Sequence, residues 1–325
     1  MTKTAFVTGA TGFLGLNLVE QLTLDGWHVT ALHRASSNLT YLCRFPVTLA
    51  AGTVEDPASL QAAMPADVDA VFHVAGDVSF WRGHNARQRR VNREGTRHVL
   101  TAARQAGAKK FVHTSSIAAY GLPHGSFDES APLAGEGSWI GYIDSKARGE
   151  EEVQKAVAAG MDAVILNPAN IVGPYDTAHW SQLFALIAED RLPGIPPGRA
   201  PFCHVRDVAR AHITAAERGR TGENYILGGP LATYSEAFAV VGKLLGHPVK
   251  ARPLPAFALK LAACLSELRA LPTRTEPDLT REMAALLSAD IQAQSSKAAR
   301  ELGYKSLSLE AMFRDCHDWL RAESR

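Results

Sequence analysis

The fold is decided by the stretch Thr4-Ala-Phe-Val-Thr8-Gly9-Ala-Thr11-Gly12-Phe13-Leu14-Gly15. It opens with a largely apolar run that predicts a buried β-strand over Thr4–Thr8. Three glycines, each separated from the next by two residues, follow at once, and apolar side chains then recur at helical spacing through residue 25. Because glycine has no Cβ, it allows a tight turn that other residues would block. The stretch therefore predicts a strand, a glycine turn and a helix in direct succession.

The same alternation of short apolar runs and longer helical stretches continues to about residue 170. Further strands are predicted at His28–His33, Ala70–Val74, Lys110–Thr114 and Ala163–Leu166, with helices at Gly12–Asp25, Asp56–Ala63, Arg87–Ala106 and Gly141–Ala159. Most of these strands are apolar on both faces, as in a parallel sheet that helices cover on each side. The pattern predicts an α/β protein with a doubly wound parallel sheet of the Rossmann type.

The composition excludes several broad classes of protein. The chain has 325 residues, of which 46% are hydrophobic and 21% charged, the balance of a globular protein rather than a disordered or fibrous one. Its 34 basic and 33 acidic residues leave a net charge of +1, which argues against a nucleic-acid partner. Four widely separated cysteines, and histidines without ligand spacing, argue against a metal site and for a reducing compartment. With neither a signal peptide nor an apolar stretch long enough to span a membrane, the sequence predicts a cytoplasmic protein.

The glycine turn is typical of a site for the phosphates of a dinucleotide. A helix that follows such a turn presents unpaired backbone N–H groups and the positive end of its dipole to an anion. The spacing here is G-x-x-G-x-x-G rather than G-x-G-x-x-G, and the alternative interpretation is a tight turn that is merely rich in glycine. The strand-turn-helix context favours dinucleotide binding.

The end of the second predicted strand bears on which dinucleotide binds. NAD sites usually carry a carboxylate there that binds the ribose 2′-hydroxyl, whereas this strand ends in His33-Arg34-Ala-Ser36-Ser37. The guanidinium of Arg34, with Ser36 or Ser37, suits a 2′-phosphate through charge-assisted hydrogen bonds. NADP(H) is therefore the favoured cofactor, with NAD(H) left open and an ordinary exposed arginine as the alternative interpretation.

After residue 170 the alternation weakens, and prolines and glycines indicate irregular loops. We therefore predict a dinucleotide-binding domain over residues 1–170 and a smaller, loop-rich, mainly substrate-binding domain over residues 171–325. One more strand, within residues 223–229, is expected to be interleaved with the sheet of the first domain. Capping patterns predict two helices in this half, one from Thr233 to Leu245 and one near Ser295–Leu302.

Tyr142 and Lys146 lie four residues apart near the start of a predicted helix, so both project from one helical face. A nearby lysine cation, together with an oxidised nicotinamide, stabilises a tyrosinate and is expected to lower the pKa of Tyr142. Ser115 and Ser116 follow the strand Lys110–Thr114, at the carboxyl edge where ligands bind in such sheets. Serine, tyrosine and lysine together suit hydride transfer at a carbonyl. On its own, Y-x-x-x-K also describes an ordinary surface pair.

These residues belong to a longer series of motifs. The series is Thr8-Gly9-Ala-Thr-Gly12-Phe-Leu-Gly15, Val71-Phe-His73-Val-Ala75-Gly76, Val91-Asn92-Arg-Glu-Gly95-Thr96, Phe111-Val-His-Thr-Ser115-Ser116, Tyr142-Ile-Asp-Ser-Lys146, Leu166-Asn-Pro168-Ala-Asn170-Ile-Val-Gly173-Pro174, His204-Val-Arg206-Asp207 and Ser295-Ser-Lys297. In these motifs the chain resembles, over nearly its whole length, the extended short-chain dehydrogenase/reductase superfamily with the NAD-dependent epimerase/dehydratase fold. The His33-Arg34 strand end is most similar to the branch of dihydroflavonol-4-reductase-like and 3β-hydroxysteroid dehydrogenase-like proteins.

The resemblance implies a role for each site residue. Tyr142 is the expected proton donor, Lys146 its activator and a ribose ligand, and Ser116, rather than Ser115, the hydroxyl that binds the carbonyl. The residues expected at the cofactor are Gly9, Thr11, Gly12, Phe13, Leu14, Gly15, Arg34, Val54, Val74, Ala75, Gly76, Tyr142, Lys146, Pro168 and Ile171. The chain departs from the family pattern at Thr53, where an aspartate often stands, and this weakens the expected adenine contact.

The favoured function is an NADP(H)-dependent oxidoreductase that transfers hydride between the nicotinamide and a carbonyl or alcohol substrate, such as an aldehyde or ketone. A nucleotide-sugar epimerase or dehydratase with tightly held NAD is the first alternative, although the acidic residue expected after the second strand is missing. A protein that only senses dinucleotide is the second, and the intact serine, tyrosine and lysine count against it. The expected partner is a small molecule, without nucleic acid or a membrane span, and a homodimer is left open.

Two further features have competing interpretations. Leu254–Leu268 is an amphipathic and only modestly charged stretch. An ordinary packed helix is favoured there, with a lid over an apolar substrate or a membrane-surface helix as alternatives. Five aromatic residues fall in loops that the family places near the substrate, and they suit either an apolar pocket or plain packing: Phe80, Trp81, Tyr175, Trp180 and Phe202.

Overall fold

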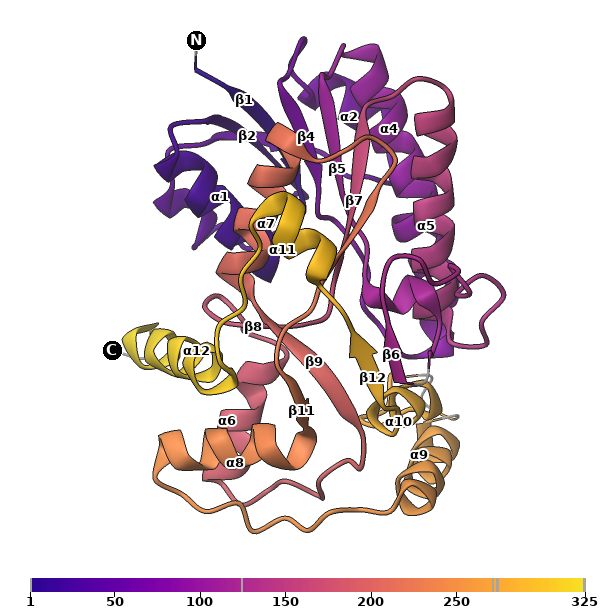
Figure 1. Ribbon diagram of the computed structural model, residues 1–325, viewed down its shortest axis with the longest axis vertical. Helices are drawn as coiled ribbons and strands as arrows, with labels where there is room; N and C mark the ends of the chain where they lie inside the picture. The colour runs from indigo at the N-terminus through magenta and orange to yellow at the C-terminus, as the bar shows by residue number, and fades with distance from the viewer. Residues whose placement is uncertain (1, 124, 271, 273–274, 324–325) are drawn as a thin grey trace.

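The computed structural model describes residues 2–123, 125–270, 272 and 275–323. Its centre is a parallel sheet of seven strands in the order β10-β7-β5-β4-β1-β2-β3 (Figure 1). The strands are β1 (Thr4–Thr8), β2 (His28–His33), β3 (Thr48–Ala51), β4 (Ala70–His73), β5 (Lys110–Thr114), β7 (Ala163–Pro168) and β10 (Asn224–Leu227). The strand order reverses between β1 and β4, which is the switch point of a doubly wound sheet. The predicted Rossmann-type α/β fold is thus confirmed.

Helices cover both faces of this sheet (Figure 1). One face carries α1 (Phe13–Leu24), α7 (Val205–Arg218) and α11 (Ser296–Leu302), and the other carries α2 (Pro57–Ala63), α4 (Thr96–Gln105) and α5 (Gly141–Ala158). Successive strand residues point to opposite faces, so Val7 and Phe72 join the first core while Phe6 and Val71 join the second. All four side chains are fully buried. Because both faces of the sheet are covered, the sequences of these strands are continuous apolar runs.

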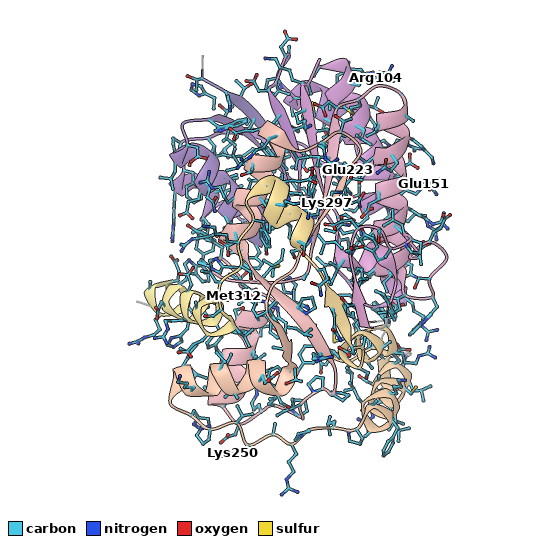
Figure 2. The ribbon with its side chains drawn as sticks, viewed as in Figure 1. Arg104, Glu151, Glu223, Lys250, Lys297 and Met312 are labelled. Atoms are coloured by element: carbon cyan, nitrogen blue, oxygen red, sulfur yellow. The ribbon has the colours of Figure 1, made fainter. Side chains whose placement is uncertain are left out.

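The edge strand β10 comes from the second half of the chain and pairs with β7. Its start is fixed to α11, where Lys297 Nζ lies 2.5 Å from the Glu223 carboxylate and 2.7 Å from the carbonyl oxygen of Asn224 (Figure 2). The second half of the chain thus completes the sheet that the first half begins.

The remainder of the second half packs beyond the carboxyl edge of the sheet (Figure 1). A three-stranded sheet of β8 (Asn170–Val172), β9 (Arg199–His204) and β11 (Leu231–Thr233) packs with α6 (Trp180–Ala188), α8 (Tyr234–Leu245) and α12 (Leu309–Glu323). A smaller sheet pairs β6 (Gly125–Phe127) with β12 (Ile291–Ala293), and α9 (Ala256–Ala270) and α10 (Arg281–Leu287) lie beside it. More of this half is regular than the sequence predicts, because these helices bury their apolar faces on one another rather than in a strand-helix alternation.

The strands and helices predicted for the first half are present, and most ends fall within one or two residues of the predicted ones. The exception is the helix predicted over residues 87–106: α3 (Asn85–Gln88) begins it, a π-helical turn follows over Arg89–Gly95, and α4 completes it. Such wide turns are rare and occur mostly at functional sites. Short 3-10 helices lie at Leu42–Arg44, Arg82–His84 and Ile117–Tyr120. None of the helices that the structure describes is both long and apolar enough to cross a membrane.

Candidate active site

The predicted site residues lie along the carboxyl edge of the seven-stranded sheet. Most of them follow the ends of its strands: Gly9 after β1, Arg34 after β2, Val54 after β3, Val74, Ala75 and Gly76 after β4, and Ser115 and Ser116 after β5. Pro168 is the last residue of β7, and Ile171 lies just beyond it in β8. Because the strands are parallel, their carboxyl ends meet along one edge, where open α/β sheets bind ligands.

The glycine turn packs directly against the end of β4. Gly9 has a φ of +70°, and a Cβ there would lie 2.6 Å from the backbone nitrogen of Ala75. A Cβ on Gly15 would lie 2.0 Å from the carbonyl oxygen of Gly9, so neither position has room for a side chain. No side chain caps the start of α1 at Gly12, so its first N–H groups form a cradle that fits the pyrophosphate of a dinucleotide. The predicted residues Thr11, Phe13 and Leu14 belong to this turn and to the first turn of the helix.

The ends of β2 and β3 form the part of the edge predicted for the adenosine. Arg34 is exposed, and within the described residues its guanidinium forms no ion pair. The Ser37 hydroxyl accepts a hydrogen bond of 3.1 Å from the backbone nitrogen of Arg34, which fixes the turn beside it. Val54 is buried against the helical segment, since a Cβ on Gly95 would lie 2.9 Å from its side chain. The arrangement leaves a cation at the strand end that suits a 2′-phosphate.

Tyr142 and Lys146 occupy the first two turns of α5, and each side chain is buried. The Ser116 side chain lies next to the Tyr142 hydroxyl and acts on its ionisation. Lys146 Nζ donates a hydrogen bond of 3.0 Å to the carbonyl oxygen of Thr114, at the end of β5. The structure thus brings Ser116, Tyr142 and Lys146 together beside the last residue of a central strand.

Burial changes the ionisation of both α5 residues. It raises the pKa of the Tyr142 hydroxyl, and the neighbouring Ser116 side chain opposes that rise. It lowers the pKa of Lys146 to about 8, while the Glu150 carboxylate acts in the opposite direction. At the phenol, loss of solvation dominates among the protein's own groups. The lower pKa expected for Tyr142 beside Lys146 and an oxidised nicotinamide stays a prediction.

Glu150 lies one turn beyond Lys146 on the same face of α5, and the sequence analysis does not identify it. Its side chain is fully buried, and burial raises its pKa. The carboxylate accepts hydrogen bonds from the side-chain amides of Asn167 at 2.5 Å and Asn224 at 2.8 Å, and the Ser115 hydroxyl also acts on it. Ser115 therefore faces Glu150, not the tyrosine. The repeated spacing of four residues is the sequence signal that would have identified Glu150.

Asn92, in the π-helical turn, is a second residue to which the sequence analysis assigns no chemistry. Its Oδ1 accepts a hydrogen bond of 2.8 Å from the backbone nitrogen of Asp77, and its Nδ2 donates to the Asp77 carbonyl and to Ser145 Oγ, both at 2.9 Å. A Cβ on Gly76 would lie 3.3 Å from Lys146 Nζ and 3.4 Å from Asn92 Oδ1, so these three residues meet. The wide turn thus holds the loop after β4 against the lysine.

Apolar side chains from outside the sheet pack against Tyr142. The Phe80 ring meets the Tyr142 ring edge-on at 5.1 Å, and Ala285 and Leu286 of α10 join the same cluster. Thr280, which caps α10, donates a hydrogen bond to the carbonyl oxygen of Phe80. We call residues 77–84 together with α9 and α10 the roof of the site, and Ser116, Tyr142, Lys146 and Glu150 its floor.

Three other aromatic residues of the predicted pocket pack elsewhere. Trp180 and Phe202 contact Phe313 in the core around α6, α8 and α12. Tyr175 contacts Trp319 of α12. Plain packing therefore explains these three residues.

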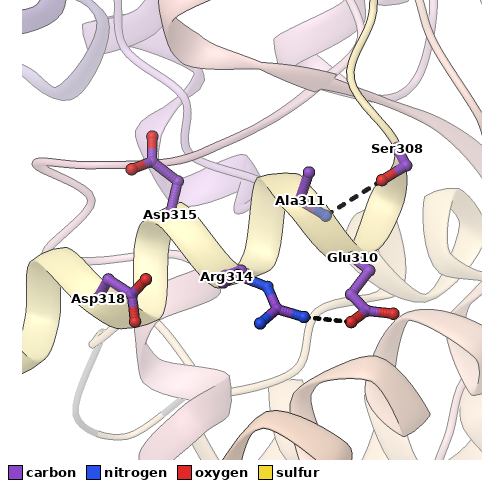
Figure 3. Close-up of a pocket in the computed structure, with 6 residues that line it drawn as sticks. All are labelled: Ser308, Glu310, Ala311, Arg314, Asp315 and Asp318. Carbon is purple, nitrogen blue, oxygen red and sulfur yellow. Dashed lines mark hydrogen bonds and ion pairs between the residues drawn. The ribbon is translucent and has the colours of Figure 1, made fainter.

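An open hollow on the surface along α12 is separate from the site (Figure 3). Its lining comes from the start of that helix and its first turns: Ser308, Glu310, Ala311, Arg314, Asp315 and Asp318. Arg314 pairs with Glu310, and Ser308 Oγ accepts a hydrogen bond of 3.3 Å from the backbone nitrogen of Ala311. The hollow contains no residue of the sheet edge. In the described part of the chain, no group of three or more His, Cys, Asp and Glu side chains is placed to hold a metal ion.

The sequence profile of the NAD dependent epimerase/dehydratase family matches residues 5–228. The chain belongs to this family. The matched segment runs from β1 to just beyond β10, so it contains the whole seven-stranded sheet together with Tyr142 and Lys146. Epimerase/dehydratase family proteins bind a nicotinamide dinucleotide, and the cradle at the glycine turn fits that group.

Full-length relatives place the chain among the extended short-chain oxidoreductases of this epimerase/dehydratase family. It is 33% identical to sterol demethylase protein B of Methylococcus capsulatus, over 98% of both chains. It is 31% identical to a putative dihydroflavonol 4-reductase of Synechocystis, over 99% of this chain and 95% of that one. The crystal structure of gox2253 superposes with a TM-score of 0.85 at 32% identity, and the match covers 100% of this chain and 99% of that one. The predicted resemblance to the superfamily is confirmed.

Proposed function

We propose that the protein is an NADP(H)-dependent oxidoreductase that transfers a hydride between the nicotinamide and a carbonyl or alcohol substrate. The observation that carries this proposal is that the Ser116 side chain and the Tyr142 hydroxyl lie together beside the buried Lys146, whose Nζ donates to the carbonyl oxygen of Thr114. Two hydroxyl groups in such an arrangement are able to hold one carbonyl oxygen, with a cation close by. The likeness to a putative dihydroflavonol 4-reductase supports a ketone as the oxidised substrate.

In the reductive direction, the Ser116 hydroxyl orients the substrate carbonyl, and the Tyr142 hydroxyl donates a proton to its oxygen. The glycine turn over residues 9–15 would hold the pyrophosphate of NADPH, which would supply the hydride that turns the C=O group into an alcohol. The Lys146 ammonium stabilises the tyrosinate that remains. Because burial raises the pKa of Tyr142, the phenol keeps its proton until the substrate oxygen accepts it.

The substitution Tyr142→Phe tests the proposed proton donor, since it removes the hydroxyl and keeps the ring that packs on Phe80. We expect kcat for NADPH-dependent reduction across a panel of aldehydes and ketones to fall by about 10²- to 10⁴-fold. Binding of NADPH, followed by fluorescence, should stay close to that of the wild type. Undiminished turnover in the variant would overturn the assignment. So would release of near-stoichiometric NAD from freshly purified, denatured protein, which would point to an epimerase or dehydratase that recycles its cofactor.

The substitution Arg34→Ala tests the preference for NADP(H). The loss of one charge-assisted contact to a 2′-phosphate should lower kcat/KM for NADPH by about 10- to 100-fold and leave kcat/KM for NADH nearly unchanged. Arg44→Ala is the matched control, because Arg44 is also exposed but is paired with Glu323. Equal losses with the two dinucleotides would show that Arg34 does not distinguish them.

A further inference from the structure

The helix α9 in the roof is apolar on two opposite sides. Its inner side packs on α10, where Leu259 and Ala263 are buried against Ala284. Its outer side carries four large apolar residues that are 47–74% exposed: Phe257, Leu261, Leu265 and Leu268. Their spacing places all four within an arc of about 80° around the helix. Packing against α10 explains the inner side of α9 and leaves this outer stripe without a partner among the described residues.

The charges around the stripe have one sign. Lys260 and Arg269 flank it on either side of the helix, and Arg252 lies in the segment before it. None of these three cations forms an ion pair with any residue that the structure describes. The acidic residue of α9, Glu267, is already paired with Arg82 at 2.7 Å and with Arg281 at 2.8 Å. An exposed apolar stripe bordered by unpaired cations is the pattern of a helix that lies in the interface of an anionic membrane.

The helix that carries the stripe is linked to the candidate active site through the rest of the roof. α10 packs on α9 with one side, and its Ala285 and Leu286 pack in the cluster of Tyr142. The pair between Arg82 and Glu267 ties α9 to residues 77–84, which carry Phe80 to the Tyr142 ring. Figure 1 shows α10 between α9 and the small sheet of β6 and β12, with α9 at the outer edge of the molecule. One layer of helix therefore separates the stripe from the tyrosine.

We propose that the outer side of α9 docks on the surface of an anionic phospholipid bilayer, from which an apolar carbonyl substrate enters beneath the roof. Docking requires only the stripe and its cations, whereas the entry of substrate rests on the function proposed above. Charge favours the bilayer over a second copy of the chain. In a two-fold dimer the same patch meets itself, so Lys260 and Arg269 would be brought against like charges.

Sedimentation with vesicles tests the docking without cofactor or substrate. The full chain should bind vesicles of equal parts phosphatidylcholine and phosphatidylglycerol, and bind far more weakly to phosphatidylcholine alone or in high salt. The double variant Leu261→Glu/Leu268→Glu should lose about ten-fold or more in vesicle affinity. Leu24→Glu is the matched control, because Leu24 of α1 is 79% exposed on the sheet domain, and its affinity should be unchanged. Equal binding by the three proteins, or none by the wild type, would overturn the proposal.

Two more measurements separate the remaining outcomes. Light scattering of the free protein would overturn the proposal if it showed a dimer that Leu261→Glu/Leu268→Glu converts to a monomer, because the stripe would then be a subunit interface. In activity assays, the rate with an apolar ketone dissolved in vesicles, divided by the rate with a water-soluble carbonyl, should be lower for the double variant than for the wild type. Vesicle binding through α9 without reduction of any carbonyl would refute the proposed function and the entry route while supporting docking. Carbonyl reduction without vesicle binding would support the proposed function and refute docking, and with it the entry of substrate from the bilayer.

Discussion

The floor and the roof of the site are held in place by different kinds of interaction. In the floor, Lys146 donates to a backbone carbonyl, and the buried Glu150 accepts from the amides of Asn167 in β7, which is buried, and Asn224 in the adjoining β10, which is half-buried. In the roof, ion pairs join residues 77–84, α9 and α10, and the arginines of two of these pairs, Arg82 and Arg281, are 56% and 43% exposed. Buried polar networks fix one geometry, because any unpaired member is costly, whereas exposed ion pairs contribute little. The difference suits a site that keeps its chemistry rigid and admits substrate through its less constrained side.

The largest expected effect comes from removing the buried charge of the floor. Lys146→Met keeps the length of the side chain and should lower kcat by about 10²- to 10⁴-fold. The same change should stabilise the fold, because burial lowers the pKa of Lys146 from 10.5 to about 8, and the folded state therefore bears the cost of a desolvated cation. That cost is at most about 3 kcal/mol at pH 7, less the hydrogen bond to Thr114.

The pH dependence of this gain follows from the two pKa values. Below about pH 8 the lysine is charged in both states, so the gain in the free energy of unfolding is complete. Between about 8 and 10.5 the unfolded chain binds more protons, so the wild type gains stability with rising pH and the difference between the two proteins disappears. Thermal unfolding of Lys146→Met and of wild type at pH 7 and pH 10 measures this difference in stability between the two proteins. Lys155→Met, at an exposed position of α5, should change stability by less than about 0.5 kcal/mol. A Lys146→Met protein that is less stable at pH 7 would contradict this account of the floor.

A smaller effect is expected when the charge of Glu150 is removed. Glu150→Gln withdraws the carboxylate that raises the pKa of Lys146, so the pKa of the lysine should fall further. The fall of kcat/KM on the alkaline side should then move to lower pH, by about half a unit to one unit. Glu151→Gln is the control, since Glu151 lies on the outer side of α5 in an ion pair with Lys155 (Figure 2). If both variants keep the wild-type pH profile, Glu150 has only a structural role.

The floor was largely predictable because its signals are local in the sequence. The glycine turn depends on contacts within a few residues and against the next strand, and Tyr142 and Lys146 share a face through helical spacing alone. Ser115 and Ser116 together followed from their place after a predicted strand, and the family resemblance favoured Ser116. Glu150 shares the four-residue spacing of Tyr142 and Lys146, but the spacing does not show its partners, Asn167 and Asn224, which lie 17 and 74 residues further along the chain. The raised pKa of Tyr142 in the protein alone was not predicted, because the phenol packs against Phe80 and α10, which the sequence did not position.

The roof was poorly predictable for a related reason. The pattern of Leu254–Leu268 predicts a helix, yet its apolar residues lie on two sides of that helix. Only the packing of α10 shows which side is covered. From the sequence, Phe80 and Trp180 are both predicted as aromatic residues in loops near the substrate. In the structure Phe80 contacts Tyr142, whereas Trp180 belongs to a separate core. These outcomes are decided by contacts between segments distant in the chain, which composition and spacing do not encode.

The smallest expected effect concerns the ion pairs of the roof, and it distinguishes the roof from the floor most directly. Glu267→Gln weakens the pairs with Arg82 and Arg281, and because both arginines are largely exposed the free energy of unfolding should change by less than about 1 kcal/mol. Glu310→Gln is the matched control, since Glu310 of α12 also pairs with two basic residues, Arg314 of the same helix and Lys243 of α8, away from the site. Both variants should have similar stability, but only Glu267→Gln should raise KM for an apolar ketone, by a factor of about two to five, with kcat nearly unchanged. A fall in kcat as large as that of Lys146→Met would mean that the roof also fixes the reacting groups, and the contrast between the two regions would not hold.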